Sequence, residues 1–201
     1  MTLDDLLPHV LPHVKQCPND TARFHLREAA IDFCERSLVW QEFQTPVPTV
    51  AGQTTYAYAP AVGQRVVKLL GATLNGIRTS VLDPVTGRHL GGSSSTATYL
   101  QGRMDGFEIH PAQAAGLPIV TLAAVCPTRA VDSLPASFER YTAQLARGAC
   151  ARIMMIANQP FSMPTRAKDL EQQFESDIGD ARMEAVRGFA RTSPRTTASW
   201  F

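Results

Sequence analysis

The spacing of apolar residues changes twice along the chain, and this change constrains the fold more than any other feature. From Asp20 to Phe43 apolar side chains recur at the spacing of an amphipathic helix. This spacing is lost after Trp40 and returns only near residue 136. Two helical stretches separated by a stretch of different period predict a helical body with an inserted β module.

The first long helix is predicted over about residues 20–40. Asp20 is a suitable N-cap, because its carboxylate accepts free backbone N–H groups of the first turn. A helix of about 20 residues is ~30 Å long, the width of a small domain. Before it, residues 3–14 form a helical stripe that Pro8 and Pro12 should reduce to a short, kinked helix. The predicted buried side of the long helix consists of Leu26, Ala29, Ala30, Phe33 and Cys34.

Between residues 41 and 132 the sequence predicts short strands joined by turns. Asn75-Gly76 and Asp105-Gly106 are hairpin signals, because a type I′ turn needs positive φ at both central positions. Residues 117–125 form an apolar final strand. We expect about six strands in a small antiparallel sandwich or barrel.

Two further helices follow the β module. The first runs from about Pro135, which fits the first helical position, to about Ile156. Small residues between 143 and 151 allow close approach of another helix, and we expect helix 20–40 to be that neighbour. The second helix runs from about Pro164 to Arg187. Its predicted buried stripe is Leu170, Phe174 and Ile178.

The predicted fold class is therefore α+β, with a four-helix bundle-like body, an inserted antiparallel β-sandwich or barrel, and an extended C-terminal arm. The helical domain comprises residues 1–40 and 133–190, the β domain residues 41–132, and the arm residues 191–201. With 201 residues, 44% of them hydrophobic, the chain is long enough to bury a substantial core.

Composition gives no support for a partner that is bound by overall charge. The formal net charge of +1 gives no global electrostatic argument for a nucleic acid or a membrane. Charged residues make up 18%, below the ~25% of typical soluble domains, as expected of a subunit that neighbours cover. The start, MTLDDLL, is acidic where a signal peptide is basic, and no apolar run approaches the ~20 residues of a membrane span. We expect a soluble protein made in the cytoplasm.

No metal or cofactor site is predicted. His9, His13 and Cys17 have the spacing i, i+4, i+8, with His25 as a conceivable fourth zinc ligand. The neighbouring prolines disturb that geometry, so we interpret these residues as polar neighbours of an apolar stripe. The cysteines contain no CxxC pair, and we expect buried, reduced thiols at Cys17, Cys34, Cys126 and Cys150.

No catalytic constellation is found, and we expect no enzyme. The chain lacks GxSxG, HExxH and GxGxxG. Glu28, Asp32 and Glu35 share a helix side and leave a cell-wall hydrolase as an alternative, but Asp32 and Arg36 have the spacing of an ordinary surface ion pair. Residues 91–95 (GGSSS) lack the lysine of a P-loop and favour a surface loop.

The C-terminal segment leaves three interpretations open. Arg191, Arg195, Trp200 and Phe201 combine charge with aromatic surface. Such a segment binds nucleic acid by charge and stacking, docks on another protein as a short linear segment, or has no role.

Several stretches together resemble the adaptor proteins of the head–tail connector in short-tailed bacteriophages. They are REAAIDFCERSLVWQEF, VAGQTTYAYAP, VVKLLGATLNG and FEIHPA. The order of parts is also similar: two N-terminal helices, an inserted β module, two helices and an extended arm.

The resemblance implies a structural virion protein of the head–tail connector. It implies a dodecameric ring of this chain beneath the portal protein, which extends the DNA channel and offers a platform to a tail nozzle or fibre protein. The arm then binds the portal through Arg191, Arg195, Trp200 and Phe201. Genomic DNA passes the lumen without specific binding, as the near-neutral charge also favours. The first alternative is a nucleic-acid-binding protein that uses the arm.

Overall fold

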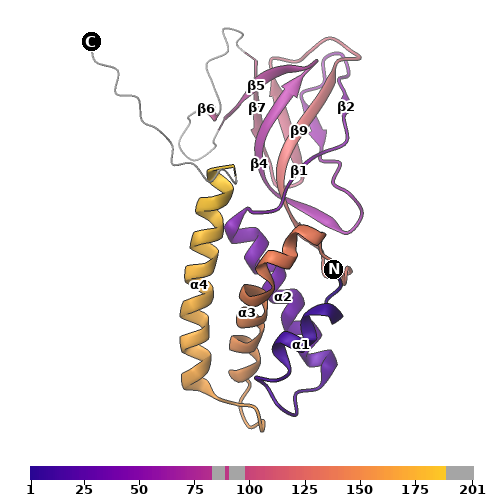
Figure 1. The fold of residues 1–201 in the computed structure, drawn as a ribbon. Helices are drawn as coiled ribbons and strands as arrows, with labels where there is room; N and C mark the ends of the chain where they lie inside the picture. Colours follow the sequence, from indigo (N-terminus) through magenta and orange to yellow (C-terminus); the bar gives the residue numbers. More distant parts are fainter. Residues whose placement is uncertain (83–88, 91–97, 189–201) are drawn as a thin grey trace, which may run out of the picture. The chain divides into compact units, whose positions relative to one another are not determined.

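The structure, a computed structural model, describes residues 1–82, 89–90 and 98–188 (Figure 1). It is a mixed α+β fold that divides into two compact units, a helical unit of Met1–Ala29 with Pro135–Phe201 and a β unit of Ala30–Leu134. The division falls inside helix α2 (Asn19–Ser37), so α2 belongs to both units. The predicted domain boundaries near residues 40 and 133 stay a prediction.

The helical unit begins with a very short helix. The 3₁₀ segment η1 (Asp4–Leu6) leads into α1 (Leu7–Val10), which has only four residues. Pro8 is tolerated at the start of α1, but Pro12 lacks the N–H that a continuing helix needs. The first helix is thus short, as the sequence predicted, but the predicted four-helix bundle-like body is not seen in residues 1–29 and 135–188.

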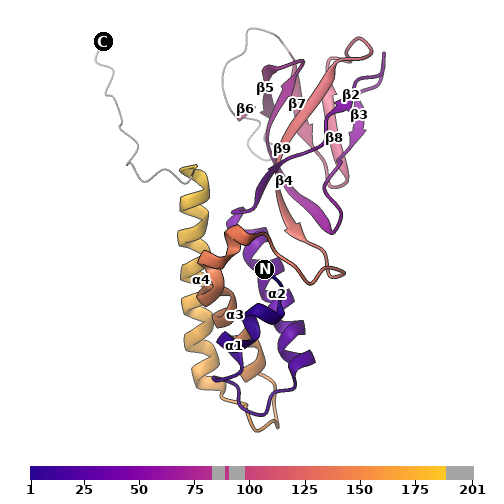
Figure 2. The same ribbon diagram turned by 45° about the vertical axis from the view of Figure 1, so that its right-hand side comes forward.

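Helices α3 and α4 pack against each other along small residues. The chain enters the pair through the 3₁₀ segment η2 (Ala136–Tyr141), continues as α3 (Thr142–Met154) and returns as α4 (Pro164–Val186) (Figure 2). Gly148 of α3 lies beneath the ring of Phe174 of α4. The helix that covers this small residue is thus α4, whereas the sequence predicted helix 20–40. The buried side of α4 consists of Ala167, Phe174, Ile178, Ala181 and Ala185.

The β unit is a curled sheet that forms a half-barrel rather than a closed barrel or a sandwich (Figure 2). Its main path is β1-β9-β4-β5-β7-β8-β3, with β2 on β9 and β6 on β5. All pairs are antiparallel except β5 with β7, so the prediction of antiparallel strands holds for every pair but that one. The strands are β1 (Gln41–Phe43), β2 (Val47–Pro48), β3 (Thr55–Ala57), β4 (Gln64–Leu74), β5 (Ile77–Leu82), β6 (His89–Leu90), β7 (Tyr99–Gly102), β8 (Gly106–His110) and β9 (Pro118–Pro127).

The curl and the turns have local causes. Two register shifts interrupt the pairing of β4 with β9, and such irregularities bend a strand and increase its twist. Asn75 and Gly76 both have positive φ, 50° and 77°, so the predicted tight hairpin between β4 and β5 is confirmed. The concave side encloses a core of Tyr56, Leu69, Ala72, Val81, Leu100, Phe107, Ile109 and Ile119.

Candidate functional site

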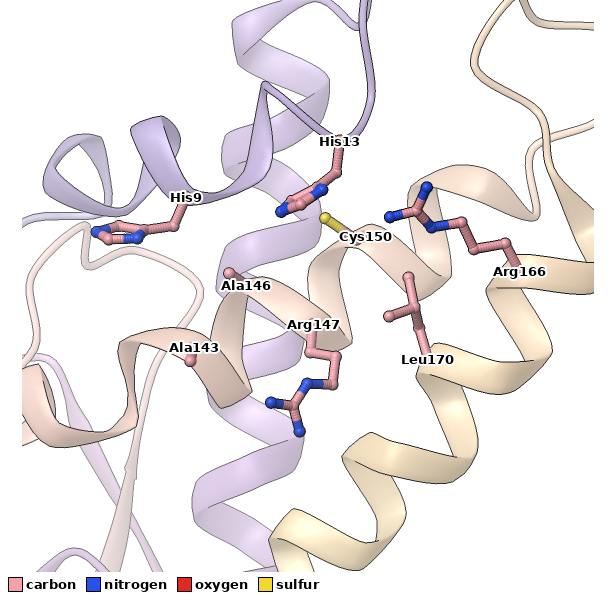
Figure 3. Close-up of a pocket in the computed structure, with 8 residues that line it drawn as sticks. All are labelled: His9, His13, Ala143, Ala146, Arg147, Cys150, Arg166 and Leu170. Atoms are coloured by element: carbon pink, nitrogen blue, oxygen red, sulfur yellow. The ribbon is translucent and has the colours of Figure 1, made fainter.

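A cavity of about 250 Å³ lies in the helical unit where α1, α3 and α4 meet (Figure 3). Small and apolar side chains of α3 and α4 form one part of its wall, and nitrogen-bearing side chains from all three segments form the rest. The lining residues are His9, His13, Ala143, Ala146, Arg147, Cys150, Arg166 and Leu170. None of these residues is acidic.

Cys150 is a structural part of this wall. Its side chain is almost fully buried, and its thiol lies 3.9 Å from the carbonyl oxygen of Val10, to which it donates. Burial raises the pKa of Cys150 to about 11, although the nearby Arg166 acts in the opposite direction. The thiol is therefore neutral at pH 7, which argues against a nucleophilic role.

The two arginines of the cavity differ in their surroundings. Arg147 forms an ion pair with Asp177 of α4, and burial raises the pKa of Asp177 while Arg147 lowers it. Arg166 is exposed and forms no ion pair within the part of the chain that the structure describes. In Figure 3 the guanidinium group of Arg166 points toward Cys150, whereas that of Arg147 points away from it.

The histidines that the sequence singled out reach the cavity without forming a metal site. His9 and His13 are both exposed and line it, but Cys17 does not. Within residues 1–82, 89–90 and 98–188, no group of three or more His, Cys, Asp or Glu side chains is placed to hold a metal ion.

Two carboxylates of α2, those of Asp32 and Glu35, form ion pairs with arginines. Glu35 pairs with Arg65 of β4, and Asp32 lies 3.7 Å from Arg36 one turn further along the helix. The thiol of Cys126 also lies 3.9 Å from a carboxylate oxygen of Glu35. The pair of Asp32 with Arg36 has the spacing of the ordinary surface ion pair that the sequence predicted.

Two of the sequence predictions fall outside the described residues. They are the loop at residues 91–95 and the arm with Arg191, Arg195, Trp200 and Phe201. Among the helices that are described, none is long and apolar enough to cross a membrane.

A second surface, at one end of the β unit, was missed by sequence reasoning. Three loops meet there, because Thr49 exchanges backbone hydrogen bonds with Gly116 and Leu117 and the amide of Asn75 donates to Pro118. The loops that meet at this end, residues 44–54, 74–77 and 111–118, contain no Asp, Glu, Lys or Arg, and the exposed Arg78 follows directly in β5. We call this region the uncharged end.

Hydrogen bonds join the loops of the uncharged end, and these loops expose apolar side chains. The hydroxyl of buried Thr49 donates to the carbonyl of Ala114 (2.6 Å) and accepts from the amide of Leu117 (2.8 Å). Val50 is 52% exposed and Ile77 is 68% exposed. Uncharged surface with exposed apolar side chains is typical of protein–protein contact. The sequence feature that could have indicated this surface is the long stretch without charged residues.

Comparison with known protein families identifies the family to which the chain belongs. A profile of the SU10 adaptor protein family matches residues 1–198. The chain belongs to this family. A search of curated proteins gives no match.

SU10 adaptor proteins are adaptors of short-tailed phages, so the resemblance seen in the sequence is confirmed. The chain is thus a structural component of a phage virion that associates with other virion proteins. For an SU10 adaptor protein, the features to explain are surfaces for association rather than a reaction centre.

Proposed function

We propose that this SU10 adaptor protein is the head–tail connector adaptor that forms a dodecameric ring beneath the portal protein. The ring extends the DNA channel and provides a platform for a tail nozzle or fibre protein. Family membership over residues 1–198 is the observation that carries the proposal. In such a ring each copy contacts the next in a head-to-tail manner. Each copy therefore needs two different surfaces that are complementary to each other.

Each part of the chain has a place in this proposal. The helical domain, residues 1–40 and 133–190, forms the body of the ring, and the β domain, residues 41–132, presents the uncharged end to a tail protein. The arm, residues 191–201, binds the portal through Arg191, Arg195, Trp200 and Phe201. Arginine and tryptophan are the residue types that most often anchor protein interfaces.

The uncharged end supports a role in protein contact rather than DNA contact. Binding to the phosphate backbone requires lysine and arginine side chains, and the loops of this end, residues 44–54, 74–77 and 111–118, have none. DNA therefore passes through the ring without being held at this surface.

The mass of the assembly tests the proposal. The purified chain is measured by native mass spectrometry alone and after mixing with the portal protein of the same phage. We expect a complex that contains a ring of adaptor copies on one portal. If the mixture contains only free portal and free monomer at micromolar concentrations, the connector role is wrong. Tight, salt-dependent binding of the same sample to duplex DNA would instead favour the nucleic-acid-binding alternative.

A further inference from the structure

The side of α4 that faces away from α3 is exposed along the whole helix. In Figures 1 and 2, α3 lies along one side of α4, and no other described helix of this unit lies on the opposite side. A Cβ atom at Gly179, on this side, would meet no heavy atom within 4 Å, so packing among the described residues gives no reason for a glycine there. We call this side the outer face of α4; its residues, spaced by three and four, are Gln172, Ser176, Gly179, Met183 and Val186.

Acidic residues flank the outer face. From residue 169 to residue 181, α4 contains five acidic residues and neither lysine nor arginine. Arg147 pairs with Asp177, but Asp169, Glu171 and Asp180 are exposed and form no ion pair with any residue that the structure describes. The lysine and arginine residues of α4 lie toward its two ends. The middle of the outer face therefore favours a cationic segment.

The chain supplies such a segment directly after α4. Residues 189–201, FARTSPRTTASWF, lie outside the described residues and contain two arginines but no aspartate or glutamate. Gly188 precedes them with a φ of +63°, and its amide donates to the carbonyl of Ala185. A glycine with positive φ ends a helix and allows the chain to change direction. The segment is therefore cationic and begins where α4 ends.

The length of this segment matches the length of α4. At ~1.5 Å per helical residue, Gly188 lies ~36 Å along the axis from Pro164. The 13 residues from 189 to 201 reach at most ~43–47 Å when extended. A segment that returns antiparallel to α4 thus spans the whole outer face.

The same arithmetic brings opposite charges to the same level. Arg191 lies at most ~10 Å beyond Gly188 and comes level with Asp180. Arg195 lies at most ~25 Å beyond Gly188 and comes level with Glu171. The two arginines therefore meet the two ends of the acidic stretch of α4.

The aromatic end of the segment then reaches the loop between α3 and α4. Residues 155–163 contain no charged residue. In this loop Met155 is 48% exposed and Met163 is 46% exposed, and the amide of Met163 donates to the carbonyl of Met154 (3.0 Å). Thioether groups make favourable contacts with aromatic rings, so this loop suits Trp200 and Phe201.

We propose that residues 189–201 bind back along the outer face of α4 in the same chain and keep the segment from other proteins until it is displaced. A segment joined to α4 through Gly188 is present at an effective concentration in the millimolar range, which favours it over the segment of a second copy. The regulatory consequence rests on the proposed function, because the portal is the proposed partner of the segment. The contact within the chain does not depend on that function.

The contact is tested by paramagnetic relaxation in the full chain. A nitroxide label is attached at Thr197→Cys; the four native cysteines are buried, so the label reacts at the new one. We expect broadening of amide signals at residues 165–172, at the end of α4 remote from Gly188. Asp169→Lys with Glu171→Lys should reduce it at least about threefold, because attraction becomes repulsion. Asp105→Lys, in the turn before β8, should leave it as in wild type.

Two results would overturn the proposed contact. One is the absence of broadening at residues 165–172, and the other is broadening that the two lysine substitutions leave unchanged. A mixed sample separates the chain's own segment from that of a second copy. It contains isotope-labelled chain without nitroxide and unlabelled chain with nitroxide. Broadening in the mixed sample would place the segment on a second copy and make the proposal wrong.

The regulatory consequence is tested by the rate of association with immobilised portal. Asp169→Lys with Glu171→Lys should bind about three- to tenfold faster than wild type, because a larger fraction of chains has a free segment. Asp105→Lys should bind at the wild-type rate. Equal rates for all three chains would show that the contact does not restrain the segment. If the wild-type chain does not bind portal at all, the proposed function fails, and the relaxation measurement still decides the contact.

Discussion

At the scale of single residues, Gly148 determines how closely α3 and α4 approach. A Cβ atom at this position would lie 2.7 Å from a ring carbon of Phe174. We expect Gly148→Ala to lower the free energy of unfolding by about 1–3 kcal/mol, because overpacking outweighs the gain of about 1 kcal/mol in helix propensity. Urea-induced unfolding followed by circular dichroism measures the change.

The matched control for this prediction is Gly179→Ala in α4. A Cβ atom at Gly179 meets no heavy atom within 4 Å, so this variant should be as stable as wild type or more stable by up to ~1 kcal/mol. Equal stability of the two alanine variants would show that Phe174 moves aside without cost.

Thr49 is the residue on which the uncharged end depends. Its side-chain oxygen makes two hydrogen bonds, to Ala114 and from Leu117, in a residue that is only 3% exposed. We expect Thr49→Val to lower the free energy of unfolding by about 1 kcal/mol, because the carbonyl of Ala114 and the amide of Leu117 lose their hydrogen-bond partner. Thr55→Val, at an exposed position of β3, should change it by less than about 0.5 kcal/mol. A loss of the same size in both variants would contradict the assigned role of Thr49.

At the scale of elements, the hairpin of β7 and β8 should show a pH-dependent stability. The hydrogen bond from Arg103, followed by that from His110, lowers the pKa of Glu108 from its usual 4.5. A lowered folded-state pKa means that this carboxylate stabilises the fold above pH 4.5, and that its contribution disappears as the pH falls through the folded value.

The corresponding test compares urea midpoints of wild type and Glu108→Gln. We expect the variant to be less stable at pH 7 and indistinguishable from wild type near pH 3. The effect is small, because both partners are accessible to solvent. Asp105→Asn removes a carboxylate of the same hairpin that has no ion pair with any residue that the structure describes, and it should show no such difference at pH 7. A constant difference between wild type and Glu108→Gln at both pH values would contradict the assignment.

The elements that the sequence predicted well are those set by local patterns. Periodicity placed the long helix at about residues 20–40, close to the observed Asn19–Ser37, and the Asn75-Gly76 signal placed its hairpin. The parallel pairing of β5 with β7 joins Ser80 to Tyr99, and no local pattern encodes such a contact. The strands β2 and β6 have two residues each, too few to show a period.

The cavity could not be predicted from local sequence patterns either. Sequence reasoning singled out His9 and His13 but treated them as neighbours of an apolar stripe. Arg147 and Arg166 lie more than 100 residues away in the chain and reach the same space only through the packing of α3 and α4. The lining of the cavity thus arises from tertiary structure, which no local sequence pattern encodes.

At the scale of the whole molecule, the proposed function assigns the portal contact to residues 191–201. The family match ends at residue 198, so it includes Arg191 and Arg195 but not Trp200 and Phe201. The matched range thus covers the two arginines of the proposed arm and ends before its two aromatic residues. This difference allows their contributions to portal binding to be tested separately.

We expect deletion of residues 191–201 to weaken portal binding by at least about 100-fold, because such anchors contribute several kcal/mol together. Arg191→Gln with Arg195→Gln, and separately Trp200→Ala with Phe201→Ala, should each give a smaller loss. Binding is measured by surface plasmon resonance on immobilised portal, with circular dichroism to show that the helices persist. Unchanged affinity after the deletion would remove the arm from the portal contact. If instead the arginine changes abolish a salt-dependent affinity for DNA and leave portal binding intact, the arm is a nucleic-acid-binding segment.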